Sequence, residues 1–155
     1  MKDIIAHLLQ SDPAHATAED FERLHDVWRA LSDGIIRAAH RVDGTWTADT
    51  DVKQVILWAF RAGALEDVPA GETFHFTDKH TLPVQRFDAA SGRRIVPGGT
   101  TVRDGAYVAP GVIVMPPAYI NIGAYVDEQT LVDSHALVGS CAQIGKRVHL
   151  SAGVQ

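Results

Sequence analysis

Hydrophobic residues in the first hundred positions recur at the spacings of amphipathic helices. One stripe, with intervals of three and four, predicts a helix of about 20 residues; its members are Phe21, Leu24, Trp28, Leu31, Ile35 and Ala38. Thr17 and Asp20 are expected to cap the start of this helix, because short polar side chains satisfy free backbone N–H groups there.

Two further helices are expected on either side of this one. A second face predicts a helix with Thr50 as its cap and Gly63 at its end; this face consists of Val52, Val55, Ile56, Ala59 and Phe60. A short leading helix is predicted from Ile4, Ile5, Leu8 and Leu9.

Strand signals are sparser in this region. Asp43-Gly44, between Arg41-Val42 and Thr45-Trp46-Thr47, predicts a tight hairpin turn. Glu72–Asp78 alternates and is expected to be a strand. The pattern indicates a small α/β domain in which the aromatic side chains form a packed core.

From residue 102 onward the hydrophobic period changes to six. An aliphatic residue stands at every sixth position: Val102, Val108, Val114, Ile120, Val126, Val132, Val138, Ile144 and Leu150. Four residues after each stands a small or β-branched one: Ala106, Val112, Ala118, Ala124, Thr130, Ala136, Ala142, Val148 and Val154. A period of six fits neither a helix, with 3.6 residues per turn, nor a single strand.

This repeat predicts a triangular parallel β-helix. Each hexad forms one short side and a turn, and three hexads form a coil of about 18 residues with parallel pairing to the next coil. The expected ladders are Val114–Val132–Leu150 and Ala106–Ala124–Ala142 inside, and Tyr107–Tyr125 on an outer face. The period leaves open both the handedness of the coil and whether it serves only as a spacer or assembly surface.

Composition divides the chain at the same place. Residues 1–97 hold 26 of the 33 charged residues, all three Trp and all five Phe, whereas residues 98–155 hold eight of the 13 Gly. The Pro97-Gly98-Gly99 breaker therefore predicts two parts, a helical α/β domain over 1–97 and an incomplete solenoid over 98–155.

Charge and hydropathy exclude several classes of protein. The formal net charge is −5 and no basic run is present, which argues against a nucleic-acid partner. No apolar run approaches the roughly 20 residues of a membrane-spanning helix, and the N-terminus lacks the features of a signal peptide. The single cysteine, Cys141, suits a reducing cytoplasm.

Three segments of the repeat go beyond a generic hexad pattern: NIGAYVDE from Asn121, LVDSHALVGSCAQIGK from Leu131 and RVHLS from Arg147. They closely resemble the tetrahydrodipicolinate N-succinyltransferases, hexapeptide-repeat acyltransferases of lysine and diaminopimelate biosynthesis. The match is dense over residues 94–154, and the N-terminal layout is similar.

The resemblance implies a left-handed coil, a homotrimer and active sites in clefts between neighbouring β-helices. It implies transfer of a succinyl group from succinyl-CoA, a co-substrate rather than a bound cofactor, to tetrahydrodipicolinate. The product of that reaction is N-succinyl-2-amino-6-oxopimelate.

Two residues match functional positions of the family. Arg94 stands where the family has an arginine that binds a substrate carboxylate, a task suited to a guanidinium fork. Asp133 stands where the family has an aspartate beside the acyl-accepting nitrogen, and a carboxylate there can take or orient the amine proton. Taken alone, Arg94 also fits a solvated surface arginine, and Asp133 a turn residue.

The chain also departs from the family pattern. Ser134-His135 stands where many members have Thr-Trp, and family members extend well past residue 155. The CoA-binding residues are therefore expected beyond these positions, and this chain is expected to be a fragment or truncated product that associates with itself. Two alternatives follow, a non-catalytic assembly fragment and an acetyl-CoA-dependent N-acetyltransferase.

The histidines and the cysteine do not form a recognised metal motif. His135 and His149 lie 14 residues apart rather than at the 18-residue stacking distance, and no HxH, HExxH or CxxC is present. We therefore expect no metal site, although a hydratase-like trimer with interfacial histidines is a formal alternative. Cys141 is expected to be a small residue near a solenoid turn.

Overall fold

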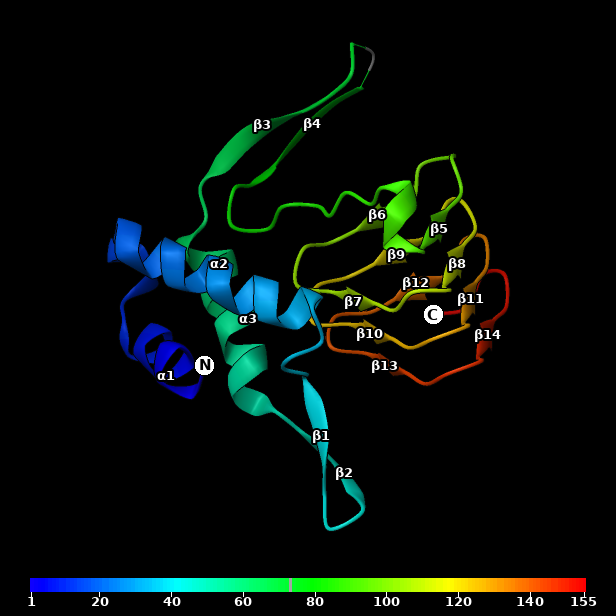
Figure 1. Cartoon of the computed structure of the whole chain (residues 1–155). Coiled ribbons are helices and arrows are strands. Elements are labelled where there is room, and N and C mark those ends of the chain that lie inside the picture. Colours follow the sequence, from blue (N-terminus) through cyan, green and yellow to red (C-terminus); the bar gives the residue numbers. More distant parts are fainter. Residues whose placement is uncertain (73) are drawn as a thin grey trace.

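The computed structural model describes residues 1–72 and 74–155. In Figure 1 a helical region packs against one side of a column of stacked coils, and two β-hairpins extend from the helical region. A helical region followed by a parallel β-solenoid of about three coils is therefore confirmed.

The three predicted helices are present as α1 (Lys2–Gln10), α2 (Ala18–Ser32) and α3 (Thr50–Ala62), with 3₁₀ turns η1 (Pro13–His15) and η2 (Ala89–Ser91). The predicted length of α2 is wrong, because the helix has 15 residues and Ile35 and Ala38 follow it. It stops where Gly34 adopts a left-handed backbone (φ +71°) against the ring of Tyr107. Ile35 is consequently 73% exposed rather than part of the buried stripe.

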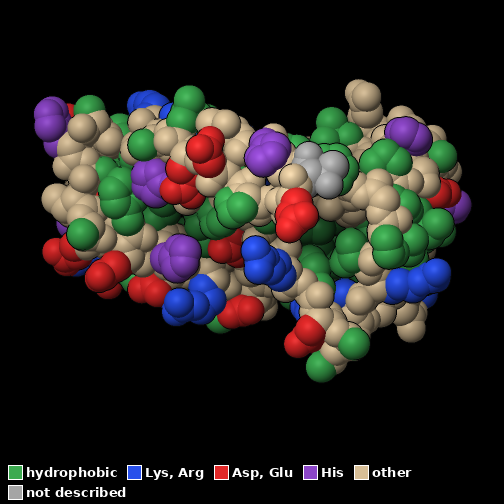
Figure 2. All heavy atoms as spheres, turned by 90° about the horizontal axis from the view of Figure 1, so that it is seen from above, with side chains coloured by type: hydrophobic (Ala, Val, Ile, Leu, Met, Phe, Trp, Pro, Cys, Tyr) green, Lys and Arg blue, Asp and Glu red, His purple; other side chains and the backbone are tan. Residues whose placement is uncertain are grey.

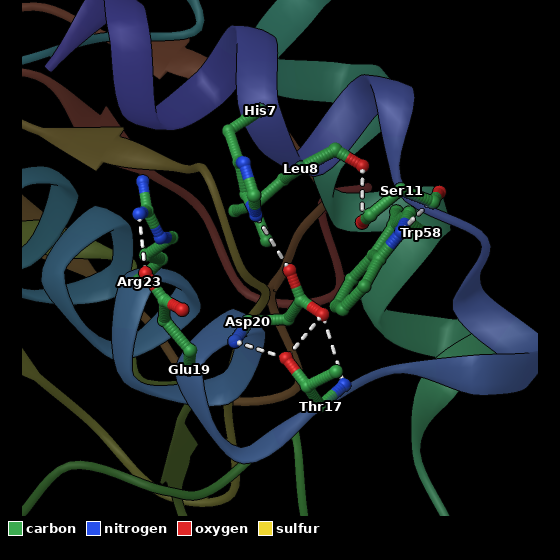
Figure 3. A network of polar contacts seen from close by, with 8 residues as sticks. All are labelled: His7, Leu8, Ser11, Thr17, Glu19, Asp20, Arg23 and Trp58. Atoms are coloured by element: carbon green, nitrogen blue, oxygen red, sulfur yellow. Dashed lines mark hydrogen bonds and ion pairs between the residues drawn. The ribbon is translucent and has the colours of Figure 1, made fainter.

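The expected cap of α2 is present as a capping box (Figure 3). Thr17 Oγ1 accepts from the Asp20 N–H at 3.2 Å, and the Asp20 carboxylate accepts from the Thr17 N–H at 2.8 Å. The second Asp20 oxygen lies 2.8 Å from His7 Nε2, which ties α1 to α2. The Thr17 N–H and hydroxyl, followed by His7, hold the pKa of the buried Asp20 carboxyl below its ordinary value.

The cap of α3 lies one residue before the predicted one. Asp49 Oδ1 accepts from the Val52 N–H at 3.2 Å, and Thr50 is the first helical residue. Asp49 is the cap residue because a cap has an extended backbone, as Asp49 does, whereas Thr50 is already helical. Gly63 ends the helix as predicted.

The helical region has its own core, formed by α1, α2, α3 and neighbouring loops. Trp28 and Trp58 are fully buried, and their indole N–H groups donate to the carbonyls of Thr81 (2.8 Å) and Ser11 (3.2 Å). The prediction that all the aromatic residues of this region are packed in a core is wrong. The exposed ones are Trp46, Phe60, Phe74 and Phe76.

The exposed aromatics on strands belong to the two hairpins. The predicted turn at Asp43-Gly44 joins β1 (Ala39–Val42) to β2 (Thr45–Ala48), and both turn residues have positive φ. In the second hairpin, β3 (Leu65–Ala70) pairs with β4 (Phe74–Lys79). Strand β3 was not predicted from the sequence. The strand predicted over 72–78 corresponds to β4, but Glu72 lies in the turn and residue 73 is outside the described residues.

The solenoid consists of two-residue strands at the predicted period. They are β5 (Arg94–Ile95), β6 (Thr101–Val102), β7 (Tyr107–Val108), β8 (Ile113–Val114), β9 (Tyr119–Ile120), β10 (Tyr125–Val126), β11 (Leu131–Val132), β12 (Leu137–Val138), β13 (Gln143–Ile144) and β14 (His149–Leu150). From β6 onward the second residue of each strand is the predicted aliphatic one, and all nine contribute to the solenoid core.

Three parallel sheets form the sides of the prism, in the orders β5-β8-β11-β14, β6-β9-β12 and β7-β10-β13. Val114, Val132 and Leu150 are in register, as predicted from the 18-residue coil. Strand β5 pairs with β8 although it precedes Pro97, so the first solenoid strand lies upstream of the Pro-Gly-Gly segment.

The helical region covers the sheet of β7, β10 and β13. Tyr107 and Tyr125 stack as predicted, with ring centroids 4.4 Å apart, and the Arg37 guanidinium lies 3.5 Å from the centroid of Tyr125. Gly123 allows α3 to approach the solenoid closely, because a Cβ at this position would lie 2.9 Å from Ile56 Cδ1 on α3. The sheet of β5, β8, β11 and β14 lies on the side of the solenoid away from α1, α2 and α3 (Figure 1).

None of the helices in residues 1–72 and 74–155 is long and apolar enough to cross a bilayer.

Candidate functional site

Both predicted site residues belong to the sheet of β5, β8, β11 and β14, on the side of the solenoid remote from the helices (Figure 1). Successive side chains of a strand alternate between the two faces of a sheet. Ile95, Val114, Val132 and Leu150 therefore point inward, and the residues on either side of them point outward. The outward rows are Arg94–Ile113–Leu131–His149 and Val96–Met115–Asp133–Ser151.

Arg94 is the first residue of β5, and its side chain is exposed. Its backbone N–H donates to the Val112 carbonyl at 3.0 Å, which fixes the strand while leaving the guanidinium outside the prism. The neighbouring Arg93 is different, because its guanidinium is occupied by the carbonyls of Val108 and Ser91. Arg94 thus presents a cation with the geometry to bind a carboxylate.

Arg93 also borders a cleft that Arg94 does not line. The cleft lies between the end of α2 and the segment before β5, and its walls include Ser32, Gln85 and Arg86. Neither Arg94 nor Asp133 is among the residues that line this cleft.

Asp133 follows β11 directly and is half-buried. Its Oδ1 accepts from the backbone N–H of Ser134 at 2.8 Å, and its Oδ2 lies 3.1 Å from His149 Nε2. The Ser134 N–H, followed by His149, holds the pKa of the Asp133 carboxyl below its ordinary value. Asp133 is therefore a carboxylate at neutral pH.

The bond from Asp133 to the next backbone N–H is a local turn feature that recurs in the solenoid. Asn121 and Asp127 occupy the same hexad position, and each accepts from the following N–H at 2.8 Å. The alternative interpretation of Asp133 as a turn residue is therefore partly correct. The contact with His149 is what distinguishes it from these two equivalents.

The sheet brings Arg94 and Asp133 to one face without direct contact. Two coils separate them, which at the spacing of parallel strands is about 10 Å along the ladder. Between them lie the half-buried hydrophobic side chains of Ile113, Leu131 and Met115. A small dicarboxylic molecule with a nitrogen centre could contact a cation at one end of this strip and a carboxylate at the other.

His149 was not predicted as part of the site. The 18-residue stacking offset of the coils aligns His149 with Leu131 rather than with another histidine. Asp133 stands two residues after Leu131, so it is the diagonal neighbour of His149 on the same face. The 16-residue offset, combined with the alternation of side chains, could have revealed the pair.

The histidine and cysteine side chains are the remaining candidates for metal or thiol chemistry. Within the described part of the chain, no three His, Cys, Asp or Glu side chains come together as metal ligands could. Cys141 lies in a solenoid turn, as predicted, and packs against the helical core with its Sγ 3.6 Å from Ser140 Oγ.

The surface differs between the two ends of the molecule (Figure 2). Acidic side chains gather over the helical end, whereas the solenoid end exposes hydrophobic side chains and fewer charges. The stacked parallel coils, with one two-residue strand about every six residues from β6 onward, define this part of the chain as a β-solenoid built from six-residue repeats.

Comparison with known proteins identifies relatives of this chain by name. The chain is similar to curated proteins named 2,3,4,5-tetrahydropyridine-2,6-dicarboxylate N-succinyltransferase. The protein of Burkholderia mallei strain SAVP1 is 43% identical over 89 residues, covering 55% of this chain and 32% of that protein. The Escherichia coli strain SMS-3-5 protein is 42% identical over the same lengths.

These matches confirm the resemblance predicted from the sequence motifs. The chain spans about a third of the length of the curated relatives it matches. No family model matches the chain.

Proposed function

We propose that the protein transfers the succinyl group of succinyl-CoA to the nitrogen of tetrahydrodipicolinate, and so acts in lysine and diaminopimelate synthesis. The observation that carries the proposal is the identity with relatives named for this reaction, together with the exposed Arg94 and the half-buried Asp133 on one sheet face. The reaction belongs to the whole protein, since the matched segment covers a third of those relatives.

The chemistry of the two side chains suits this reaction. The Arg94 guanidinium would bind one carboxylate of the acceptor through paired N–H donors. Water adds across the C=N bond of the cyclic imine, so that the acceptor nitrogen of the hydrated ring carries an N–H. The Asp133 carboxylate would take that proton as the nitrogen attacks the thioester carbonyl. A C–N bond to the succinyl group forms, the C–S bond to CoA breaks, and the CoA thiolate leaves and takes up the proton from Asp133. The ring C–N bond of the hydrated acceptor then breaks, which opens the ring to the 6-oxo product.

A second copy of the chain would complete such a site. The strip between Arg94 and Asp133 is open and partly hydrophobic, and a neighbouring β-helix packed against it would make a cleft from which water is displaced. We therefore include a left-handed homotrimer in the proposal. The free, half-buried Cys141 thiol supports placing the protein in the cytoplasm.

The test is a comparison of acyl donors with the complete product of the gene. CoA release is measured with tetrahydrodipicolinate and either succinyl-CoA or acetyl-CoA, and the product is identified by its mass. We expect N-succinyl-2-amino-6-oxopimelate and a clear preference for succinyl-CoA. Equal rates with the two donors would refute succinyl specificity, and acceptor-independent release or none would favour a non-catalytic assembly role.

A further inference from the structure

The side chains of His149 and Asp133 meet on the outer face of the solenoid, across adjacent strands. We propose that His149 is a positioning residue that holds the Asp133 carboxylate in the orientation needed for acyl transfer. This inference rests on the proposed function, because it concerns the same site.

The contact arises from the register of the coils. His149 opens β14 and pairs with Leu131 of β11, while the Asp133 N–H donates to the Leu150 carbonyl at 3.0 Å. The two outward side chains are therefore diagonal neighbours on adjacent strands. Such neighbours are within reach of each other when one side chain is long.

Two donors fix the carboxylate from different directions. The Ser134 N–H holds Oδ1 at 2.8 Å, and His149 Nε2 holds Oδ2 at 3.1 Å. With a single hydrogen bond the carboxylate could still turn about its Cβ–Cγ bond, whereas hydrogen bonds to both oxygens restrict that rotation. Each oxygen still has lone-pair capacity for a substrate N–H, because a carboxylate accepts about four hydrogen bonds.

The charge of Asp133 determines which residue donates the hydrogen bond between Asp133 and His149. Asp133 is ionised at neutral pH and carries no proton, so the hydrogen bond is donated by His149 Nε2. Both the neutral ring in this tautomer and the protonated ring can donate in this way. His149 therefore holds the carboxylate without having to change its own charge.

A contribution to folding is a weak explanation for the contact. His149 is exposed and Asp133 only half-buried, and exposed ion pairs contribute at most about 1 kcal/mol to stability. Asn121 and Asp127 have the same turn bond without a histidine partner of this kind. The histidine is thus dispensable for the turn and lies beside the carboxylate to which the proposed function assigns the acceptor nitrogen.

The test compares two substitutions of His149 in the complete product of the gene. His149→Phe keeps a ring of similar size and removes the donor, whereas His149→Gln restores an N–H at the end of a side chain of similar length. His75→Phe, at an exposed position on β4, is the matched control. The readouts are the titration of the Asp133 carboxyl by ¹³C NMR, and kcat and KM for succinyl transfer.

We expect His149→Phe to raise the pKa of Asp133 and to lower kcat by about 10- to 100-fold, the scale of a misplaced catalytic group. The KM for succinyl-CoA should stay unchanged, and His149→Gln should recover most of the kcat. His75→Phe should resemble the wild type in both readouts.

The activities of the wild type and of His149→Phe distinguish an error about His149 from an error about the proposed function. An active wild type with an equally active His149→Phe variant, or an unchanged Asp133 titration in that variant, overturns the role of His149 alone. A wild type that transfers no succinyl group overturns the proposed function, and with it any role in that reaction.

Discussion

Arg94 and Asp133 emerge from the same face of one parallel sheet, two coils apart, with hydrophobic side chains between them. Neither residue contacts the other, and each is held by the backbone ladder of its own strand. The distance between their backbones is therefore set by the rise of the solenoid rather than by flexible loops. Such a rigid spacing suits recognition of a small molecule with charges at two ends.

Asp133→Asn should lower the turnover of the proposed transfer at least about 100-fold, the scale of a lost general base. The amide keeps the turn bond to Ser134 but cannot take a proton. The measurement is kcat for CoA release by the complete product of the gene.

Asp127→Asn is the matched control for this substitution. Asp127 has the same bond to the next N–H, on a different sheet of the solenoid. It should leave turnover near the wild-type value. Near-wild-type activity of Asp133→Asn would remove Asp133 from the mechanism.

Arg94→Ala should raise the KM for tetrahydrodipicolinate about 10- to 100-fold, because a lost charge-assisted pair costs roughly 1.5–3 kcal/mol. The KM for succinyl-CoA should change little. Arg86→Ala removes another exposed arginine, on the segment before β5, and serves as the control. The same increase in both variants would point to a general effect of charge instead of a carboxylate contact at Arg94.

The sequence predicted the solenoid better than the helical region, and the reason is physical. Each inward position of the prism repeats the same environment, so nine aliphatic residues at one period locate every strand from β6 onward. The end of α2 depends instead on Gly34 meeting Tyr107, which is 73 residues away in the sequence. No local pattern contains that contact.

In the hairpins and the site, too, features with a clear local pattern were predicted, and features that depend on distant contacts were not. Strand β3 was missed because it is mostly exposed and contains Pro69, so it lacks the alternation of a half-buried strand. Arg94 and Asp133 were found by resemblance, whereas His149 required both the coil register and the alternation of side chains.

Gly123→Ala should destabilise the fold by about 2 kcal/mol or more. Its φ is +76°, and the added Cβ would lie 2.9 Å from Ile56 Cδ1 and 3.0 Å from Cys141 Sγ, so strain and overpacking combine. Gly111→Ala shares the positive φ (+80°) but has its nearest neighbour at 3.9 Å, and should cost only about 1 kcal/mol.

Urea unfolding of the two variants measures this difference. Equal unfolding midpoints for Gly123→Ala and Gly111→Ala would contradict tight packing of the helical region against the solenoid turn at Gly123.

Asp20→Ala should destabilise the helical region by about 1 kcal/mol at pH 7, because it removes one half of the capping box. The pKa of Asp20 is lowered in the folded chain. Its contribution is therefore complete above the carboxyl pKa of the unfolded chain, and it is lost as the pH falls through the folded-state pKa. The wild type and the variant should converge in stability in acid.

Urea unfolding followed by helical circular dichroism, at neutral and at acidic pH, checks this expectation. Asp51→Ala, in the exposed first turn of α3, should cost at most about 0.5 kcal/mol and serves as the control. A constant difference between Asp20→Ala and the wild type at every pH would contradict the role of the carboxylate charge.

The most direct test of the site is one kinetic experiment on the wild type, Arg94→Ala and Asp133→Asn. CoA release is followed at saturating succinyl-CoA while tetrahydrodipicolinate is varied. If the sheet face is the acceptor site, Arg94→Ala raises KM for tetrahydrodipicolinate and Asp133→Asn lowers kcat, each by at least about tenfold. Wild-type kcat and KM in both variants would contradict an acceptor site on this face.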